Sequence, residues 1–200
     1  MVHRRELLKT GAGLLLAAPI RIPLRLLTGV TGATTEAPDV IAETGIAAAS
    51  ELINAAQANA RHARAIDLDS TIMIRRLSEA WAANPRPLFG MTRSDIAILV
   101  EALARDRGMA VVYRGWHDHR ANGDIHHVLY GNPDVIAAMQ REFTSARGAF
   151  GRVLGRHVAE LASVGPRPAS INFTVETSGR PPRQARFVTW AVAPMGTAAA

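Results

Sequence analysis

The dipeptide Asn122-Gly123 places the tightest constraint on the fold of this chain, because Asn-Gly is the strongest short signal for a β-hairpin. An apolar segment, 110–116, precedes it and is typical of a buried strand, and a second strand-like segment, 125–130, follows it. A hairpin pairs its two strands antiparallel. We therefore expect an antiparallel sheet in this protein.

Apolar residues at helical spacing predict helices on both sides of the hairpin. Before it, such spacing covers residues 46–65, 70–83 and 94–107, and Gly108 ends the last of these segments. After it, Pro133 begins a longer helical pattern that reaches about residue 163. This pattern is interrupted by Gly148, Gly151 and Gly155. We expect these glycines either to divide the helix or to let another backbone approach closely.

Two more strands are predicted over residues 170–177 and 184–192, joined by a turn over 178–182, while the prolines in 84–90 predict a loop. The expected fold class is α+β, with a mainly antiparallel four-stranded sheet made of two hairpins, packed with helices and preceded by N-terminal helices. A chain of 200 residues has room for one such domain, which we place at 45–200. Residues 34–44, rich in Thr, Ala, Pro and Gly, are expected to form a linker.

The N-terminus carries two adjacent arginines, then leucines, a lysine and a short apolar segment at 11–18. The residues of this pattern are Arg4, Arg5, Leu7, Leu8 and Lys9. The pattern resembles the twin-arginine signal peptides, and we place the export signal at 1–33. The resemblance implies recognition by the export machinery and transport of an already folded protein, which would be periplasmic or otherwise exported.

Two basic residues, Arg21 and Arg25, follow the apolar segment and depart from the usual pattern of these signals. Cleavage after Ala33 or Ala37 is expected, and a signal that is not cleaved would tether the protein to the membrane. A basic amphipathic helix without a targeting role is the alternative. Beyond the signal, no stretch approaches the roughly 18 apolar residues of a transmembrane span.

Charge and cysteine content exclude several classes of function. The whole chain has a net charge of +6, but residues 34–200 hold 18 arginines and 16 acidic residues, a net of only +2. We therefore expect no binding to nucleic acid, whose affinity rises with the number of phosphates neutralised. The chain has no cysteine, so disulfides and thiolate metal sites are excluded.

Four of the seven histidines fall within residues 117–127. If Asn122-Gly123 forms a two-residue turn, His119 lies opposite His126, and side-chain alternation then places His117 on the same face. Three imidazoles with one open position are typical ligands of zinc or another divalent transition metal. The residues that would orient these ligands or bind water beside them are Asp118, Asp124 and His127.

Two other interpretations of the histidine cluster stay open. One or two of the histidines could serve a metal-free ligand site or an acid/base site, and the hairpin tip could equally be solvated and inert.

Three functional hypotheses follow. The first is an exported protein that binds a small ligand or acts as an accessory protein through the hairpin and the loop at 84–91. The second is a histidine-metal enzyme, hydrolytic or oxidative, that uses His117, His119 and His126. The third is a structural subunit that is exported together with a cofactor-bearing partner. The first requires nothing beyond what the sequence shows, so we rank it first.

Overall fold

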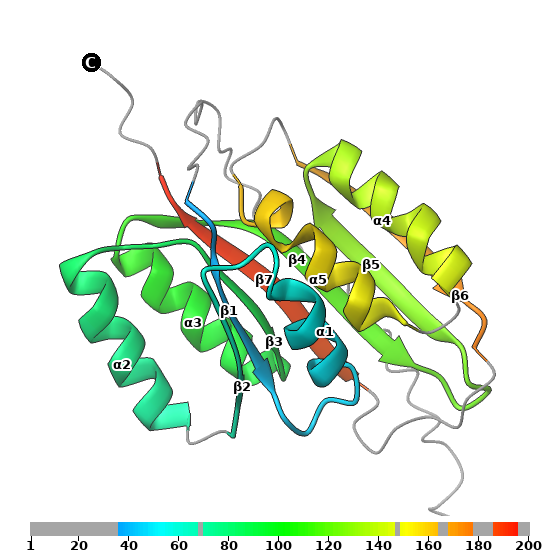
Figure 1. Ribbon diagram of the computed structural model, residues 1–200, viewed down its shortest axis with the longest axis horizontal. Coiled ribbons are helices and arrows are strands. Elements are labelled where there is room, and N and C mark those ends of the chain that lie inside the picture. The colour runs from blue at the N-terminus through cyan, green and yellow to red at the C-terminus, as the bar shows by residue number, and fades with distance from the viewer. Residues whose placement is uncertain (1–35, 68–69, 147–148, 164–167, 178–185, 196–200) are drawn as a thin grey trace, which may run out of the picture.

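The computed structural model describes residues 36–67, 70–146, 149–163, 168–177 and 186–195. The export signal predicted at 1–33 lies outside these residues. In the described chain, seven strands form one sheet in the order β2-β1-β3-β7-β4-β5-β6, and five helices pack on its faces (Figure 1). The strands are β1 (Asp39–Glu43), β2 (His62–Ile66), β3 (Leu88–Thr92), β4 (Met109–His119), β5 (Ile125–Gly131), β6 (Ala169–Val175) and β7 (Arg186–Pro194). The helices are α1 (Ala49–Ala56), α2 (Ser70–Ala83), α3 (Ser94–Asp106), α4 (Pro133–Ala146) and α5 (Phe150–Leu161).

The sheet is mixed, with a parallel part and an antiparallel part. Strand β1 pairs in parallel with both β2 and β3, and all other neighbours are antiparallel. The parallel pairs need helical crossovers, which α1 and α2 provide. The α+β class is therefore confirmed, but the sheet has seven strands where the sequence predicted four.

The second predicted hairpin is wrong. Strands β6 and β7 do not pair with each other, because β6 pairs with β5 and β7 inserts between β3 and β4. Their side chains explain this arrangement. Seven consecutive residues of β7 are buried, as expected for an inner strand, whereas β6 alternates between exposed and partly buried residues at the edge of the sheet.

Three segments before α3 also differ from the sequence predictions. Residues 39–43 of the predicted linker form β1 inside the sheet, and the helix predicted over 46–65 ends at Ala56 and is followed by strand β2. The last three residues of the loop predicted at 84–90 are the start of β3. Each missed strand has five residues, too few for a clear period, and β1 and β3 are buried almost throughout, so they show no alternation.

Helices α1, α4 and α5 pack side by side on one face of the sheet, which we call the covered face (Figure 1). The glycine prediction offered two alternatives, and both are observed among the described residues, while Gly148 itself lies outside them. The long helical pattern is divided into α4 and α5, and Gly151 and Gly155 lie directly against the backbone of α1. A β-carbon on Gly155 would lie 2.7 Å from the Leu52 carbonyl oxygen, so only glycine allows this approach.

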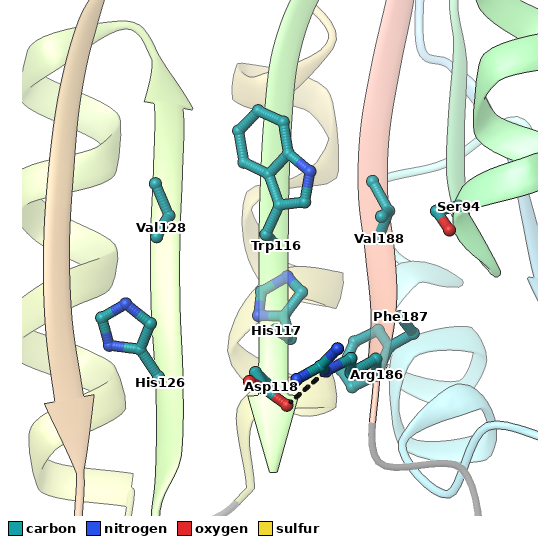
Figure 2. A pocket seen from close by; sticks show the side chains of 9 residues that line it. All are labelled: Ser94, Trp116, His117, Asp118, His126, Val128, Arg186, Phe187 and Val188. Atoms are coloured by element: carbon teal, nitrogen blue, oxygen red, sulfur yellow. Dashed lines mark hydrogen bonds and ion pairs between the residues drawn. The ribbon is translucent and has the colours of Figure 1, made fainter. Parts of the chain in front are cut away.

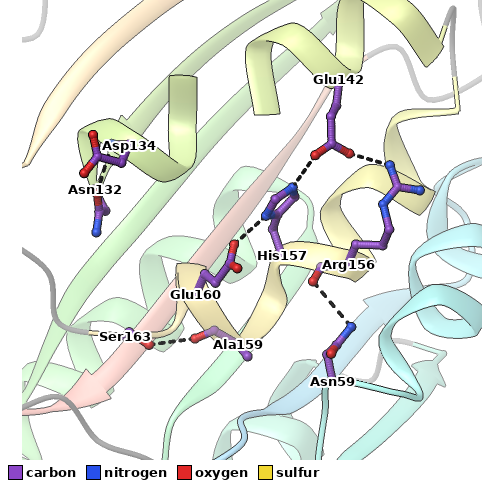
Figure 3. Close-up of polar contacts among 9 residues, drawn as sticks. All are labelled: Asn59, Asn132, Asp134, Glu142, Arg156, His157, Ala159, Glu160 and Ser163. Carbon is purple, nitrogen blue, oxygen red and sulfur yellow. Dashed lines mark hydrogen bonds and ion pairs between the residues drawn. The ribbon is translucent and has the colours of Figure 1, made fainter. Parts of the chain in front are cut away.

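A polar cluster joins α4 to α5 on the outside of the covered face (Figure 3). Glu142 on α4 accepts hydrogen bonds from Arg156 at 2.5 Å and from His157 at 2.8 Å. Burial alone would lower the pKa of His157, but its hydrogen bonds to Glu160 and Glu142 raise it. The cluster therefore favours the protonated form of this imidazole.

Helices α2 and α3 pack on the opposite face over β1, β3, β7 and the start of β4, where they enclose a second apolar core around Trp190. On this side the last three strands of the sheet carry partly or fully exposed side chains, a surface that we call the open face. Its members are Arg114, Trp116 and Asp118 of β4, His126, Val128 and Tyr130 of β5, and Ser170, Asn172 and Thr174 of β6. Among the described residues, no helix has the length and apolarity needed to cross a membrane.

Candidate functional site

The hairpin between β4 and β5 has a three-residue loop instead of the predicted two-residue turn. Gly123 N–H donates to the Arg120 carbonyl at 3.0 Å, and Arg120 N–H donates to the Asp124 carbonyl at 2.8 Å. Gly123 has a φ of 95°, the left-handed conformation that ends this type of loop. Asn122-Gly123 thus lies in the hairpin as predicted, but one residue further along the turn.

This difference shifts the predicted pairing of the two strands by one residue. His117 lies opposite His127, Asp118 lies opposite His126, and His119 lies opposite Ile125. The predicted pairing of His119 with His126 is wrong, because a shift of one residue moves a side chain to the other face of the sheet. His117, His119 and His127 face the covered side, and Asp118 and His126 face the open side.

The structure does not bring the three predicted metal ligands together, since His126 is separated from His117 and His119 by the sheet. Within the described part of the chain, no three histidine, aspartate or glutamate side chains are grouped so as to hold a metal ion. The predicted supporting residues are divided as well. Asp118 is on the open face, His127 is buried on the covered face, and Asp124 is in the loop, where its carboxylate accepts from Asn122.

On the covered face, four rings from four adjacent strands form one row, in the order Phe187, His117, His127 and Phe173. His117 stacks on Phe187 with ring centroids 4.7 Å apart, and His127 stacks on Phe173 at 5.1 Å. Phe143 of α4 and Phe150 of α5 cover the row from above. Two imidazoles are therefore enclosed almost entirely by phenyl rings.

The two buried imidazoles belong to a hydrogen-bonded chain of four side chains. His117 Nδ1 and His127 Nδ1 are 2.7 Å apart, His117 Nε2 lies 2.8 Å from Thr189 Oγ1, and Thr189 Oγ1 lies 3.1 Å from the Tyr113 hydroxyl. Either Tyr113 donates toward His127 through the chain or His127 donates toward Tyr113. Both directions use neutral imidazoles and leave each internal contact with one donor and one acceptor.

Burial sets the protonation state of these histidines. It lowers the pKa of His127 to about 3, and the nearby His119 and His126 act in the same direction. It also lowers the pKa of His117 well below its ordinary value, with His127 and His119 adding to the effect. Both imidazoles are therefore neutral near pH 7.

Gly115 makes room for this chain. A β-carbon at this position would lie 2.5 Å from Thr189 Oγ1, 2.6 Å from the Tyr113 hydroxyl oxygen and 2.8 Å from His117 Nε2. Neither Tyr113 nor Thr189 was predicted from the sequence to belong to a site. A glycine inside a predicted buried strand was the available signal, since such a glycine often marks a close approach.

On the open face and the adjoining part of β7, the same register produces two rows that run across the strands. The polar row contains Arg186, Asp118, His126 and Thr174, on β7, β4, β5 and β6 in that order. The second row lies two residues away from the polar row along each strand. It contains Val188, Trp116, Val128 and Asn172, and we call it the apolar row because three of its four members are apolar. In the polar row, Arg186 Nε donates to Asp118 Oδ1 at 3.0 Å, and His126 Nδ1 lies 3.3 Å from Thr174 Oγ1.

A pocket of ≈ 310 Å³ lies where the two rows meet (Figure 2). Its walls include Trp116, Asp118, His126, Val128, Arg186 and Val188, together with Ser94 at the start of α3. Figure 2 shows these side chains on neighbouring strands, with the Asp118–Arg186 ion pair below the indole ring of Trp116. The volume is at the lower end of the range for small-molecule sites, about 300–1,000 Å³.

Trp116 is the residue of this pocket that sequence reasoning placed differently. It ends the segment 110–116, which was expected to form a buried strand, but Trp116 is 38% exposed, whereas Trp81 and Trp190 pack in the core. The sequence predicted a binding site formed by the hairpin and the loop at 84–91, but the start of that loop lies at the opposite end of the strands from the hairpin. Residues 84–87 precede Leu88, which pairs with Val192, far along β7 from Arg186 and the hairpin.

Comparison with known proteins gives no relative for this chain. No protein-family model, curated protein or solved structure matches it.

Proposed function

We propose that this protein is an exported protein that binds a small ligand, and that the pocket on the open face is its binding site. The observation that carries the proposal is the exposure of Trp116 in a pocket lined by both polar and apolar side chains. Sites for small molecules combine apolar and aromatic walls with a few placed polar groups. The pocket around Trp116 has this composition.

The strands that form the pocket are packed and hydrogen-bonded on the covered face, which favours a preformed site. Trp116 and Asp118 alternate along β4 with Gly115 and His117, which belong to the buried hydrogen-bonded chain. Beside them, Arg114 pairs with Glu101 of α3 through Nε at 2.8 Å, and its guanidinium lies 5.2 Å from the centre of the Trp116 ring. A site on such rigid elements loses little entropy when the ligand binds.

Binding is favoured over metal-dependent turnover because the ligands of the metal hypothesis lie on opposite faces of the sheet. The export part of the proposal is supported by Arg4 and Arg5 and by the residues that follow them.

The proposal is tested by recording the indole N–H signals of the ¹⁵N-labelled full chain during a screen of small molecules. Each signal is assigned with a Trp→Phe variant. Ligands should shift the Trp116 signal and leave that of Trp190, whose buried indole donates to Thr92, in place. Leu99 is a matched control, because it is apolar and 48% exposed but does not line the pocket.

Two comparisons decide this experiment. Binding of the hits, measured by calorimetry because Trp116→Ala lacks the indole signal, should be lost in Trp116→Ala and kept in Leu99→Ala. Hits that shift other regions of the protein, or the absence of any hit at Trp116, would contradict the proposal.

A further inference from the structure

We propose that the ligand of the open face is a neutral saccharide whose sugar ring lies against Trp116, an inference that rests on the proposed binding function of this pocket. Three properties of the open face carry it, namely the balance of charge, the exposed indole and the spacing of the polar row from that indole.

The charged side chains around the pocket are matched in pairs. Asp118 accepts from Arg186 at 3.0 Å, and Arg114 is held by Glu101. A strongly anionic or cationic ligand would have to compete with one member of each pair for its partner. A neutral ligand with many hydroxyl groups can instead bond to both members while the pairs stay together.

The exposed indole suits a ring with C–H bonds on one side. An aromatic ring face is electron-rich, so it attracts groups with positive charge, as the Arg114 guanidinium near Trp116 shows. Pyranose rings present a patch of weakly positive C–H bonds on one face and hydroxyls around the edge. Such a ring gains contact with the apolar row, which also contains Val128 and Val188.

The polar row lies at the distance that the edge of such a ring requires. Asp118 is two residues beyond Trp116 on the same strand and face, a separation of about 7 Å. A sugar on the indole therefore brings its edge hydroxyls toward Asp118 and His126. Carboxylate and guanidinium groups are planar and form paired hydrogen bonds, which match two neighbouring hydroxyls of a sugar.

Other ligand classes fit the pocket less well. An acyl chain would cover the polar row without offering it hydrogen bonds, which costs free energy for each group that loses water. A flat aromatic heterocycle would stack on Trp116 but would offer few hydroxyls at its edge. Asn172 and Thr174, both exposed at the edge strand, extend the polar surface in the direction that a longer sugar chain would take.

The full chain is tested first on an array of neutral and charged glycans and then by calorimetry with cellotetraose, maltotetraose and chitotetraose. Adenosine and decanoate are the aromatic and acyl probes. At least one neutral saccharide should bind. Its affinity should fall about tenfold or more in Trp116→Ala, because stacking on an aromatic ring contributes of the order of one factor of ten.

Further variants separate stacking from hydrogen bonding. Trp116→Phe should recover part of the affinity, Asp118→Asn should lose several-fold, and Leu99→Ala should bind like the unchanged protein. Far-ultraviolet circular dichroism and thermal unfolding confirm that each variant is folded.

The outcomes separate this inference from the proposed function. If adenosine or decanoate binds at Trp116 and no neutral saccharide does, the saccharide inference is overturned and the binding function stands. If a saccharide binds equally well to Trp116→Ala, the inference is overturned because the site is elsewhere. If no probe binds and no screened molecule shifts the Trp116 signal, both proposals fail.

Discussion

At the scale of single residues, the buried pair His117 and His127 shows what an imidazole can do that other side chains cannot. Each ring carries one donor and one acceptor when neutral, so the pair continues a hydrogen-bonded chain while its faces stack on Phe187 and Phe173. A lysine or carboxylate in this place would bring a charge into the apolar core. The arrangement depends on both imidazoles staying neutral.

We predict that the free energy of unfolding falls when the pH drops below about 6.5, the ordinary histidine pKa. The pKa of His127 in the folded protein is about 3, so between these values the unfolded chain binds a proton that the folded chain does not. Each such group lowers stability by about 1.4 kcal/mol per pH unit. His117 acts in the same direction, while His157, whose pKa is raised, opposes it.

The variant His127→Phe isolates this contribution. It should be less stable than the unchanged protein at pH 7.5, by about 1–3 kcal/mol, because His117 Nδ1 loses its partner. Its disadvantage should shrink as the pH falls toward 4, as followed by urea unfolding at several pH values. Phe143→Leu, the control, removes a neighbouring ring without a titrating group and should keep the original slope. Equal slopes for His127→Phe and the unchanged protein would count against neutral burial of His127.

At the scale of elements, the contact between α1 and α5 depends on glycine. A β-carbon on Gly155 would lie 2.6 Å from Ala55 Cβ, 2.7 Å from the Leu52 carbonyl and 2.9 Å from the Ala56 nitrogen. Two of these atoms belong to the backbone and cannot move without displacing the helix.

We predict that Gly155→Ala destabilises the protein, although alanine favours a helix over glycine by about 1 kcal/mol. The clash with α1 should outweigh that gain and leave a net loss of about 2 kcal/mol, measured by denaturant unfolding. Arg152→Ala, at an exposed position of the same helix, should change stability by less than about 0.5 kcal/mol. A Gly155→Ala variant more stable than the parent would show that the helices are not in close contact.

The register of the hairpin can be tested directly, because the chain has no cysteine of its own. The double variant Asp118→Cys/His126→Cys places two thiols directly opposite each other and should form a disulfide under mild oxidation. The pair His119→Cys/His126→Cys, opposed in the register predicted from sequence, should stay reduced because its side chains lie on opposite faces. Mass spectrometry of the oxidised proteins distinguishes the two registers.

The elements predicted correctly from the sequence are those with long periods or strong boundary signals. Helices α2 and α3 and the β4–β5 hairpin fall in this group. The apolar period of α2 ends before the prolines of 84–90, that of α3 ends at Gly108, and the hairpin contains Asn122-Gly123. The strands β1, β2 and β3 were missed because five residues are too few for a clear period, and β1 and β3, which are buried almost throughout, show no alternation. The pairing of β6 and β7 was wrong because strand order depends on contacts between distant segments.

The candidate site was predictable only in its location. The histidine cluster directed attention to the correct hairpin, but the face of each side chain depends on a turn whose length the Asn-Gly signal does not fix. Trp116 and Arg186 could not be assigned to the pocket from sequence. Their exposure depends on which helices of the described chain cover this face of β4 and β7, and no local pattern in the sequence shows that.

At the scale of the whole molecule, β7 connects two parts of the sheet that differ in character. Strands β1, β2 and β3 form the parallel part, and β4, β5 and β6 form the antiparallel part that carries the open face. Only β7 pairs with both parts, and it is the last described strand in the chain. The complete sheet thus forms only after β7 has been synthesised. The proposed twin-arginine route, which would carry the folded protein, would act after this step.

We make a two-part prediction for export in a bacterium that has the twin-arginine system. Replacing Arg4 and Arg5 by lysine should leave the protein in the cytoplasm, whereas replacing Arg21 and Arg25 by lysine should not, because only the first pair belongs to the signal motif. Ala191→Asp, which puts a charge into a fully buried position of β7, should prevent folding and also block export although the signal is intact. Cell fractionation and immunoblotting give the distribution. Efficient export of unfolded Ala191→Asp would instead assign the protein to a route for unfolded chains, because export would then not depend on the pairing of β7.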